Sequence, residues 1–262
     1  MKKTLVALTV AASAVVSGSA MAWTASGSGG SLDMGGTLTP PPASTPWEVQ
    51  VGSGTPVTGL DAPFTPGNTS VTIPVRTAIP FLGIRTKNRN YFPAQVGIRP
   101  VIEYANNAVS LTNVVSGNTS LTLNVTDASG AAIGRLTSNF GVAAGVLGKV
   151  GNTVAKKGVF AGAGQAFRGG LGNNTASVPA DPKAFVNAFF PEATANFNDA
   201  GTTSWIAPSP ENFQSMTPNK EYSAFYGSGI RAGENITITL TTAPTSSNIV
   251  WKASLPISVS YF

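Results

Sequence analysis

The sequence contains neither histidine nor cysteine, and only 10% of its 262 residues are charged. Without histidine there is no imidazole base, no Ser-His-Asp arrangement and no histidine metal ligand; without cysteine there is no thiolate, structural zinc site or disulfide. The few acidic residues are scattered, and no two are placed as a carboxylate pair for hydrolysis. These absences argue against an enzyme, and no cofactor or metal ion is expected.

The first 22 residues have the pattern of a secretory signal peptide. Lys2 and Lys3 precede a short apolar run at 5–16, and Ala20-Met21-Ala22 fits a cleavage site made of small residues. This run is shorter than the roughly 20 residues that a membrane-spanning helix needs. Removing the two lysines lowers the formal net charge from +5 to +3, which argues against a nucleic-acid partner. We therefore expect export to the periplasm.

In the rest of the chain, apolar residues recur at every second position in short runs that are separated by turn residues. This alternation is typical of half-buried β-strands. The clearest runs are residues 47–51, 71–75, 121–125, 236–240 and 255–261. The content of 29 glycines and 19 prolines disfavours long helices. The pattern predicts an all-β fold, with the turn spacing of a sandwich.

Residues 181–190 are an exception and predict a short helix. Asp181 can cap its start, Pro182 suits its first position, and Pro191 ends it. The helix falls in a loop-rich stretch, about 141–220, which we interpret as an insertion into the sandwich. Within it, the Gly/Ala-rich segment 141–172 is compatible with a bulged strand, a mobile loop, or both.

Residues 23–42 have the pattern of a separate arm. Small polar residues lead into an extended segment with Leu32, Met34, Gly36 and Leu38 on one face, and Pro40–Pro42 then end any strand. An ordinary first strand that pairs within its own domain would show the same alternation. The isolation of the segment favours an arm that reaches another molecule, and Gly36 indicates a close approach to it.

The C-terminal run presents a second apolar face, made by Leu255, Ile257, Val259 and Tyr261. A plain core strand would account for this alternation. The chain nevertheless ends within the run, without a polar tail, which suggests that another molecule binds this end.

Together the two ends resemble the pilin subunits of chaperone–usher fimbriae, specifically the kappa class of K-88-like fimbriae. The similarity lies in MKKTLVALTVAASA and WTASGSGGSLDMGGTLT within residues 1–39, YGSGIRAGENITITL at 226–240 and WKASLPISVSYF at 251–262. FLGIRTK at 81–87 is a weaker match. The absence of cysteine is compatible with this class, whereas residues 141–220 show little similarity.

The resemblance implies an incomplete immunoglobulin-like sandwich, residues 43–262, whose missing strand comes from another molecule. A periplasmic chaperone would supply that strand first, and at the outer-membrane usher the arm of a neighbouring subunit would replace it. Leu32, Met34 and Leu38 would fill groove pockets, with Gly36 where the groove is shallow. The C-terminal apolar face would border the groove and be recognised by the chaperone. Its residues are Leu255, Ile257, Val259 and Tyr261. The product would be a cell-surface fimbria that contributes to adhesion to host glycans.

Trp205, Tyr222 and Tyr226 could form a platform on which a sugar stacks, or could be core aromatics. Two other functions are compatible with an exported β protein. An outer-membrane β-barrel is suggested by the terminal Phe262, although serines at 258 and 260 share its face and the runs are short for a membrane strand. A secreted, self-contained β-sandwich lectin would pair the arm within its own domain.

Overall fold

The computed structural model describes residues 45–54, 57, 59–245 and 248–262. The chain divides into two compact units, Met1–Pro42 and Ala43–Phe262, and the described residues belong to the second. The expected signal peptide and donor residues lie outside these ranges: 1–22, Leu32, Met34, Gly36 and Leu38.

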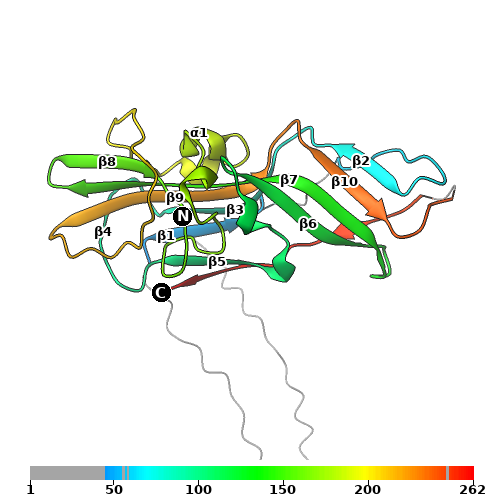
Figure 1. Cartoon of the computed structure of the whole chain (residues 1–262), viewed down its shortest axis with the longest axis horizontal. Coiled ribbons are helices and arrows are strands. Elements are labelled where there is room, and N and C mark those ends of the chain that lie inside the picture. The colour runs from blue at the N-terminus through cyan, green and yellow to red at the C-terminus, as the bar shows by residue number, and fades with distance from the viewer. Residues whose placement is uncertain (1–44, 55–56, 58, 246–247) are drawn as a thin grey trace, which may run out of the picture. The chain divides into compact units, whose positions relative to one another are not determined.

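Antiparallel β-strands form the second unit, as the alternating sequence predicts (Figure 1). The strands are β1 (Trp47–Val51), β2 (Ser70–Pro74), β3 (Ile79–Thr86), β4 (Phe92–Pro93), β5 (Pro100–Tyr104), β6 (Asn118–Thr126), β7 (Ala132–Val150), β8 (Thr153–Gly158), β9 (Lys220–Ile230), β10 (Asn235–Leu240), β11 (Lys252–Ala253) and β12 (Ile257–Tyr261). The five predicted runs coincide with β1, β2, β6, β10 and β12, although β12 begins at Ile257 rather than at Leu255.

The strands form one large sheet and one small sheet in an open, sandwich-like arrangement. The large sheet follows the order β1-β3-β9-β7-β10-β2, with β6 and β8 joined to β7, β4 to β9 and β11 to β6. The small sheet pairs β12 with β5. A loop segment lies along the other edge of β5, where the backbone N–H of Ile102 donates to the carbonyl of Arg168 over 2.8 Å. The prediction of an all-β fold is therefore confirmed.

A buried tyrosine pair connects the two sheets through the main core. The hydroxyl of Tyr104, on β5, lies 2.7 Å from the hydroxyl of Tyr226 and donates to Oγ of Ser228 over 2.7 Å, both on β9. Burial raises the pKa of Tyr104 to about 12, although these two hydrogen bonds act in the opposite direction. The remaining core consists of aliphatic side chains and aromatic rings such as Trp47 and Phe213, whose centroids lie 5.2 Å apart.

The Gly/Ala-rich segment begins as a strand, because β7 continues through residues 141–150 and β8 follows it. Burial alternates in the first half of β7, whereas every residue from Phe140 to Leu147 is buried. That half of the strand is covered on both faces, so it has no polar face to produce an alternating pattern. The loop-rich part of the stretch predicted as an insertion therefore starts only after Gly158.

Helix α1 (Pro182–Asn187) covers the outer face of the large sheet. It begins as predicted, because the Asp181 carboxylate accepts a hydrogen bond from the backbone N–H of Ala184 over 2.9 Å. A second apolar cluster lies beneath it and includes Phe189 and Phe190. Glycine on the strands makes room for these rings, since a Cβ on Gly141 would lie 2.8 Å from the Phe189 ring.

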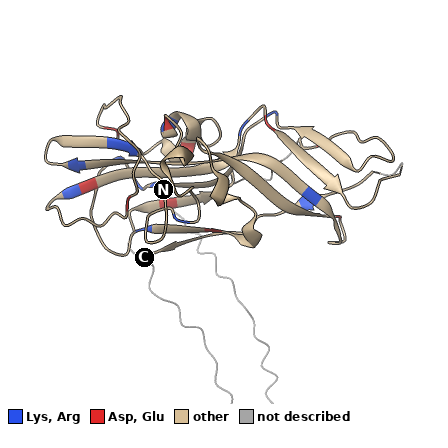
Figure 2. Ribbon diagram, in the orientation of Figure 1, with Lys and Arg blue, Asp and Glu red and all other residues tan. Residues whose placement is uncertain are grey.

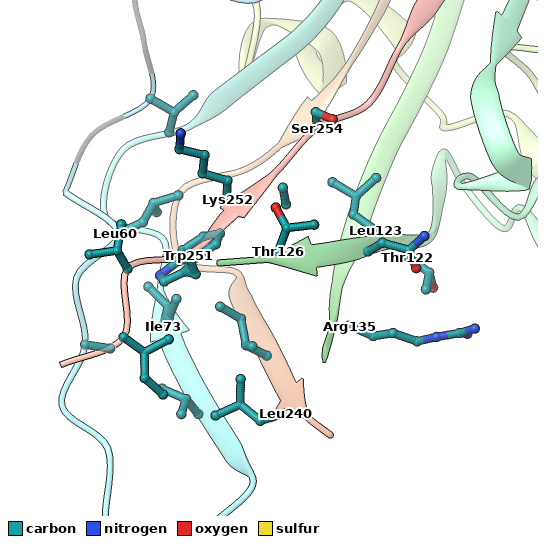
Figure 3. A pocket seen from close by; sticks show the side chains of 18 of the residues that line it. Leu60, Ile73, Thr122, Leu123, Thr126, Arg135, Leu240, Trp251, Lys252 and Ser254 are labelled. Atoms are coloured by element: carbon teal, nitrogen blue, oxygen red, sulfur yellow. The ribbon is translucent and has the colours of Figure 1, made fainter. Parts of the chain in front are cut away.

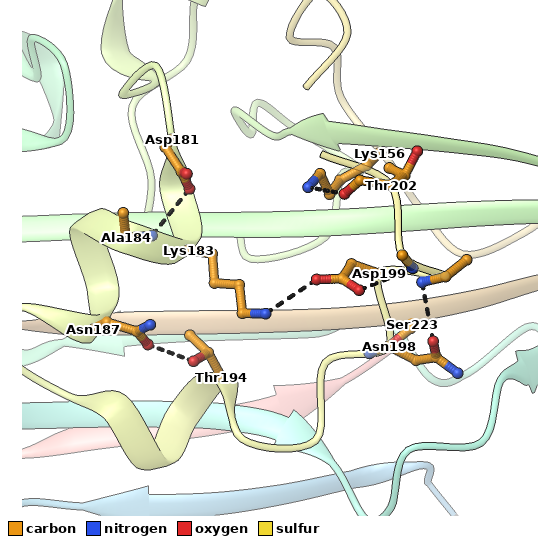
Figure 4. A network of polar contacts seen from close by, with 12 residues as sticks. Lys156, Asp181, Lys183, Ala184, Asn187, Thr194, Asn198, Asp199, Thr202 and Ser223 are labelled. Atoms are coloured by element: carbon orange, nitrogen blue, oxygen red, sulfur yellow. Dashed lines mark hydrogen bonds and ion pairs between the residues drawn. The ribbon is translucent and has the colours of Figure 1, made fainter. Parts of the chain in front are cut away.

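Polar contacts fix the segment that follows α1 onto the sheet (Figure 4). Lys183 Nζ lies 3.1 Å from Oδ2 of Asp199, and the backbone N–H of Asn198 donates to Oγ of Ser223, on β9, over 2.9 Å. Lys156 Nζ, on β8, donates to the carbonyl of Thr202 over 2.6 Å. The segment is thus bonded to two strands of the large sheet.

Candidate functional site

The C-terminal strand β12 turns an apolar face toward the core, but that face is only partly covered. Ile257, Val259 and Tyr261 are half-buried and pack against the main core, while Ser258 and Ser260 are exposed. The strand is five residues long and pairs with β5 alone. The predicted apolar face of β12 is therefore present at the border of the core.

The hydrogen bonds of β12 identify which of its backbone groups are unpaired. Phe262 and Arg99 exchange two backbone bonds of 3.1 and 3.2 Å, and the N–H of Ala105 donates to the carbonyl of Pro256 over 3.0 Å. Backbone bonds alternate along an antiparallel pair, so the even-numbered residues of β12 face β5. The N–H and C=O groups of Ile257, Val259 and Tyr261 face the outer edge and have no partner among the described residues.

Strand β1 presents a similar edge in the large sheet, where it pairs only with β3 among the residues that the structure describes. Its first residue, Trp47, is buried, whereas Val49 and Val51, which alternate onto the same face, are 41% and 56% exposed. The core-facing side of β1 is therefore uncovered along most of its length. The side chain of Thr45 lies close enough to the hydroxyl of Tyr261 to affect its pKa, which places the start of β1 beside the end of β12.

A groove of about 1960 Å³ continues from the start of β12 along the preceding chain (Figure 3). One wall consists of residues 248–256, and the facing walls come from β2, β6, β10 and the segment before β2. Figure 3 shows the Trp251 ring beside Leu60 and Ile73 inside this groove. Leu255, the first residue of the predicted C-terminal face, lines the groove and joins it to the β12 edge.

The aromatic residues predicted as a sugar platform do not come together on the surface. Tyr222 and Tyr226 are fully buried in the main core, so neither can contact a sugar in this structure. Both lie on β9, whose faces are covered by the two apolar clusters. Trp205 is half-buried and separate from them, stacked on Phe197 with ring centroids 6.2 Å apart and with Lys156 Nζ 4.6 Å from its ring.

Other kinds of site have little support in the part of the chain that the structure describes. No group of three or more acidic side chains within it could hold a metal ion. None of its helices has the length and apolar character required to span a membrane. Charged residues are thinly spread over the strands (Figure 2). The β12 edge and its adjoining groove are therefore the candidate site.

Comparison with known proteins identifies the family. The profile of the family described as "Fimbrial, major and minor subunit" matches residues 1–262. The chain belongs to the K88-type fimbrial subunits. The K88 fimbrial proteins AB and AC of Escherichia coli are each 32% identical to it, and the F41 fimbrial protein of the same species is 30% identical. In each comparison the similarity covers 100% of both chains.

Membership of the K88-type family confirms the resemblance seen in the sequence. Its members are structural subunits of fimbriae, so this subunit is not an enzyme, it associates with other fimbrial subunits, and it belongs to a cell-surface fimbria. The sequence located the β12 face but missed the open edge of β1. The exposed Val49 and Val51 could have indicated that edge only with knowledge of which strands flank β1.

Proposed function

We propose that the subunit polymerises by donor-strand exchange, in which residues 31–39 of one copy pair with the open edge of β12 in the next. The observation that carries this proposal is the row of unpaired backbone groups at Ile257, Val259 and Tyr261, above apolar side chains that are only half-buried. An uncovered edge of this kind can pair with a strand from another molecule. A strand that completes it gains backbone hydrogen bonds and apolar burial together.

The alternation of the two segments restricts the register between them. Opposite residues of an antiparallel pair have side chains on the same face, so the even-numbered apolar residues of the arm must lie opposite odd-numbered residues of β12. One register aligns all four members of both faces: Leu38 with Leu255, Gly36 with Ile257, Met34 with Val259 and Leu32 with Tyr261. Burial of the three large donor side chains would contribute roughly 5 to 9 kcal/mol before ordering costs.

The position of Thr45 favours the antiparallel direction. Thr45 is the first described residue and contacts Tyr261, so an arm that precedes it would start beside the C-terminal end of β12. A parallel donor strand would bring the neighbouring body to that same end, where the departing arm also needs space. An antiparallel strand places the neighbouring body at the Leu255 end. This head-to-tail contact does not close on itself and so generates a fibre.

The exposed edge also accounts for the partners that we propose during export. Before assembly, an apolar face beside unpaired backbone would promote aggregation. A periplasmic chaperone would cover it with a strand of its own, and the outer-membrane usher would be the place where the arm of the next subunit replaces that strand. This route requires the expected signal peptide at residues 1–22.

A contribution to adhesion to host glycans is a further part of the proposal. Of the three aromatic residues considered for it, only Trp205 has exposed surface. Binding of wild-type and Trp205→Ala fibres to an array of host glycans would test whether this residue takes part.

Two variants of the arm test the proposed assembly. Deletion of residues 23–39 should leave a chaperone-bound subunit that never enters fibres, and electron microscopy of cells should then show none. Gly36→Trp should block assembly because the indole would collide with the Ile257 side chain on the core-facing side, whereas Gly35→Trp, whose side chain would point to the opposite face, is the matched control. Fibres of normal length and number from the deletion variant would refute donor-strand exchange.

A further inference from the structure

The proposed register leaves much of the groove without an occupant. The donor face ends where Leu38 meets Leu255, but the groove continues past this residue to Trp251 and Val250. Its volume of about 1960 Å³ is about twice the upper end of the usual range for small-molecule pockets. The groove therefore fits a further stretch of polypeptide better than a small ligand.

The lining of this wide part is mixed, with an apolar and partly aromatic portion beside polar residues such as Asn248 and Lys252. Leu60, Phe64, Ile249 and Trp251 line it, and all four side chains are only partly buried. Strand pairing in the adjoining wall is short, because β11 contributes only Lys252 and Ala253, both paired with β6. The surface thus offers apolar area rather than a long ladder of backbone bonds.

The chain that follows the donor segment has the matching chemistry. Residues 40–42 are three consecutive prolines, which favour the polyproline II conformation and have no backbone N–H to donate. Such segments bind in grooves lined by aromatic residues, because they are already extended and lose little conformational entropy. Counted along the chain with the same antiparallel offset, Pro42 corresponds to Trp251, although the chain passes from the small sheet to the large sheet between β12 and β11.

We propose that the wide part of the groove binds Pro40–Pro42 of the donor subunit, with Trp251 as the surface against which the prolines pack. This inference rests on the proposed donor-strand exchange and adds a second contact to it. At about 3.1 Å per residue the three prolines span roughly 9 Å. Only residues 43 and 44 then separate them from Thr45 of the donor body, so the prolines act as a short, semi-rigid connection between subunits.

The first experiment measures how strongly assembled fibres resist heat. Fibres would be purified from Trp251→Ala, from the triple variant Pro40→Ser, Pro41→Ser, Pro42→Ser, and from the combination of both changes. Dissociation into monomers would be followed by gel electrophoresis after graded heating. We expect each change to lower the midpoint temperature, and the combination to lower it no further than the larger single effect.

Trp205→Ala is the matched control, because Trp205 is also half-buried but does not line the groove. Its effect should add to that of the proline changes. The inference would be overturned if Trp251→Ala and the proline changes lowered the midpoint temperature additively. It would also be overturned if the proline changes left this temperature unchanged in fibres that still require the arm. Fibres that form without residues 23–39 would instead overturn the proposed function.

A proximity measurement keeps Trp251 intact and so does not depend on how its replacement folds. The chain has no cysteine, so a pair can be introduced without background: Pro41→Cys with Lys252→Cys. Lys252 is exposed and lines the groove. A short bis-maleimide should then join neighbouring subunits into a ladder on a denaturing gel.

The matched control for cross-linking is Pro41→Cys with Ser258→Cys. Ser258 is exposed on β12, six residues from Lys252, which corresponds to roughly 20 Å along an extended chain. This pair should give monomers only. A ladder from the Ser258→Cys pair but none from the Lys252→Cys pair would contradict both the register and the binding of the prolines to the wide part of the groove.

Discussion

Two proline substitutions at neighbouring positions of β12 should affect folding and assembly differently. The backbone N–H of Val259 faces the open edge, whereas the alternation of bonds makes Ser258 a partner of β5. Proline removes this N–H in either case. Val259→Pro should therefore remove a hydrogen bond that is made only with a strand from another molecule, first the chaperone and then the donor subunit, whereas Ser258→Pro removes one that belongs to the subunit itself.

The size of each effect follows from one backbone hydrogen bond. Loss of one backbone hydrogen bond costs about 0.5–1.5 kcal/mol of free energy, and about 1–3 kcal/mol when the partner carbonyl stays buried without a donor. For Val259→Pro, this loss applies to the contact between subunits and corresponds to a weakening of about 5- to 150-fold. For Ser258→Pro, a loss of the same size applies to the pairing of β12 with β5, before any donor strand arrives.

The assay separates these two outcomes in cells that also produce the proposed chaperone and usher. Immunoblots of periplasmic extracts report the folded, protease-resistant subunit, and electron microscopy reports surface fibres. Val259→Pro should lose fibres while retaining more periplasmic subunit than Ser258→Pro, because it leaves the pairing of β12 with β5 intact; Ser258→Pro should reduce both. The assignment of the open edge is refuted if Val259→Pro assembles like the wild type, or if Ser258→Pro alone retains normal periplasmic subunit.

Two further predictions concern the body of the subunit. Gly227→Val should lower the unfolding temperature of purified fibres, because a Cβ at this position collides with Val186 of α1. Overpacking of this kind costs about 1–3 kcal/mol of stability. An unchanged unfolding temperature, measured by circular dichroism, would contradict this prediction. Tyr104→Phe should cost about 1–3 kcal/mol near neutral pH and flatten the loss of stability at alkaline pH. Because the pKa of Tyr104 is raised from 10.0 to about 12 in the folded state, its contribution to stability is complete below pH 10 and is lost as the pH rises to about 12. The loss amounts to roughly 3 kcal/mol. If the free energy of unfolding, measured by denaturant titration, falls equally with alkaline pH in the variant and the wild type, the prediction is refuted.

The sequence predicted those elements whose residues have one buried and one exposed face. Alternation located β12 because Ser258 and Ser260 separate its three apolar residues. The start of α1 was equally clear, since Asp181 and Pro182 act locally through a cap and a fixed φ. Both signals depend only on neighbours in the chain, so no knowledge of the tertiary structure was needed.

Elements covered on both faces were harder to recognise. Residues 141–147 of β7 contain no polar side chain to mark a solvent face, because the main core covers one side and α1 the other. Tyr222 and Tyr226 were candidates for a sugar platform for the same reason: the covering of β9 is contributed by segments far away in the sequence. Local pattern cannot distinguish a buried aromatic residue from an exposed one when the alternation is lost.

The location of the open edge depends on partners that the sequence does not reveal. The face of β12 is a local property, but whether its odd-numbered backbone groups are bonded depends on its single pairing with β5. A second strand on the outer side would give the same side-chain alternation and no acceptor edge. The same holds for β1, where Val49 and Val51 are exposed only because nothing among the described residues covers their side of the strand.

An open edge is compatible with a folded subunit because other contacts close the fold independently of it. The Tyr104 hydroxyl bonds β5 to β9, and the cluster under α1 covers the opposite face of the large sheet, so neither requires the missing strand. The incomplete region is confined to the side where β1 and β12 meet near Thr45. The strand that we propose the next subunit supplies there would be covalently continuous with that subunit's own body. Under the proposed exchange, the free energy that completes one sandwich would therefore also hold two subunits together, and the same few apolar residues would serve folding in the acceptor and cohesion in the fibre.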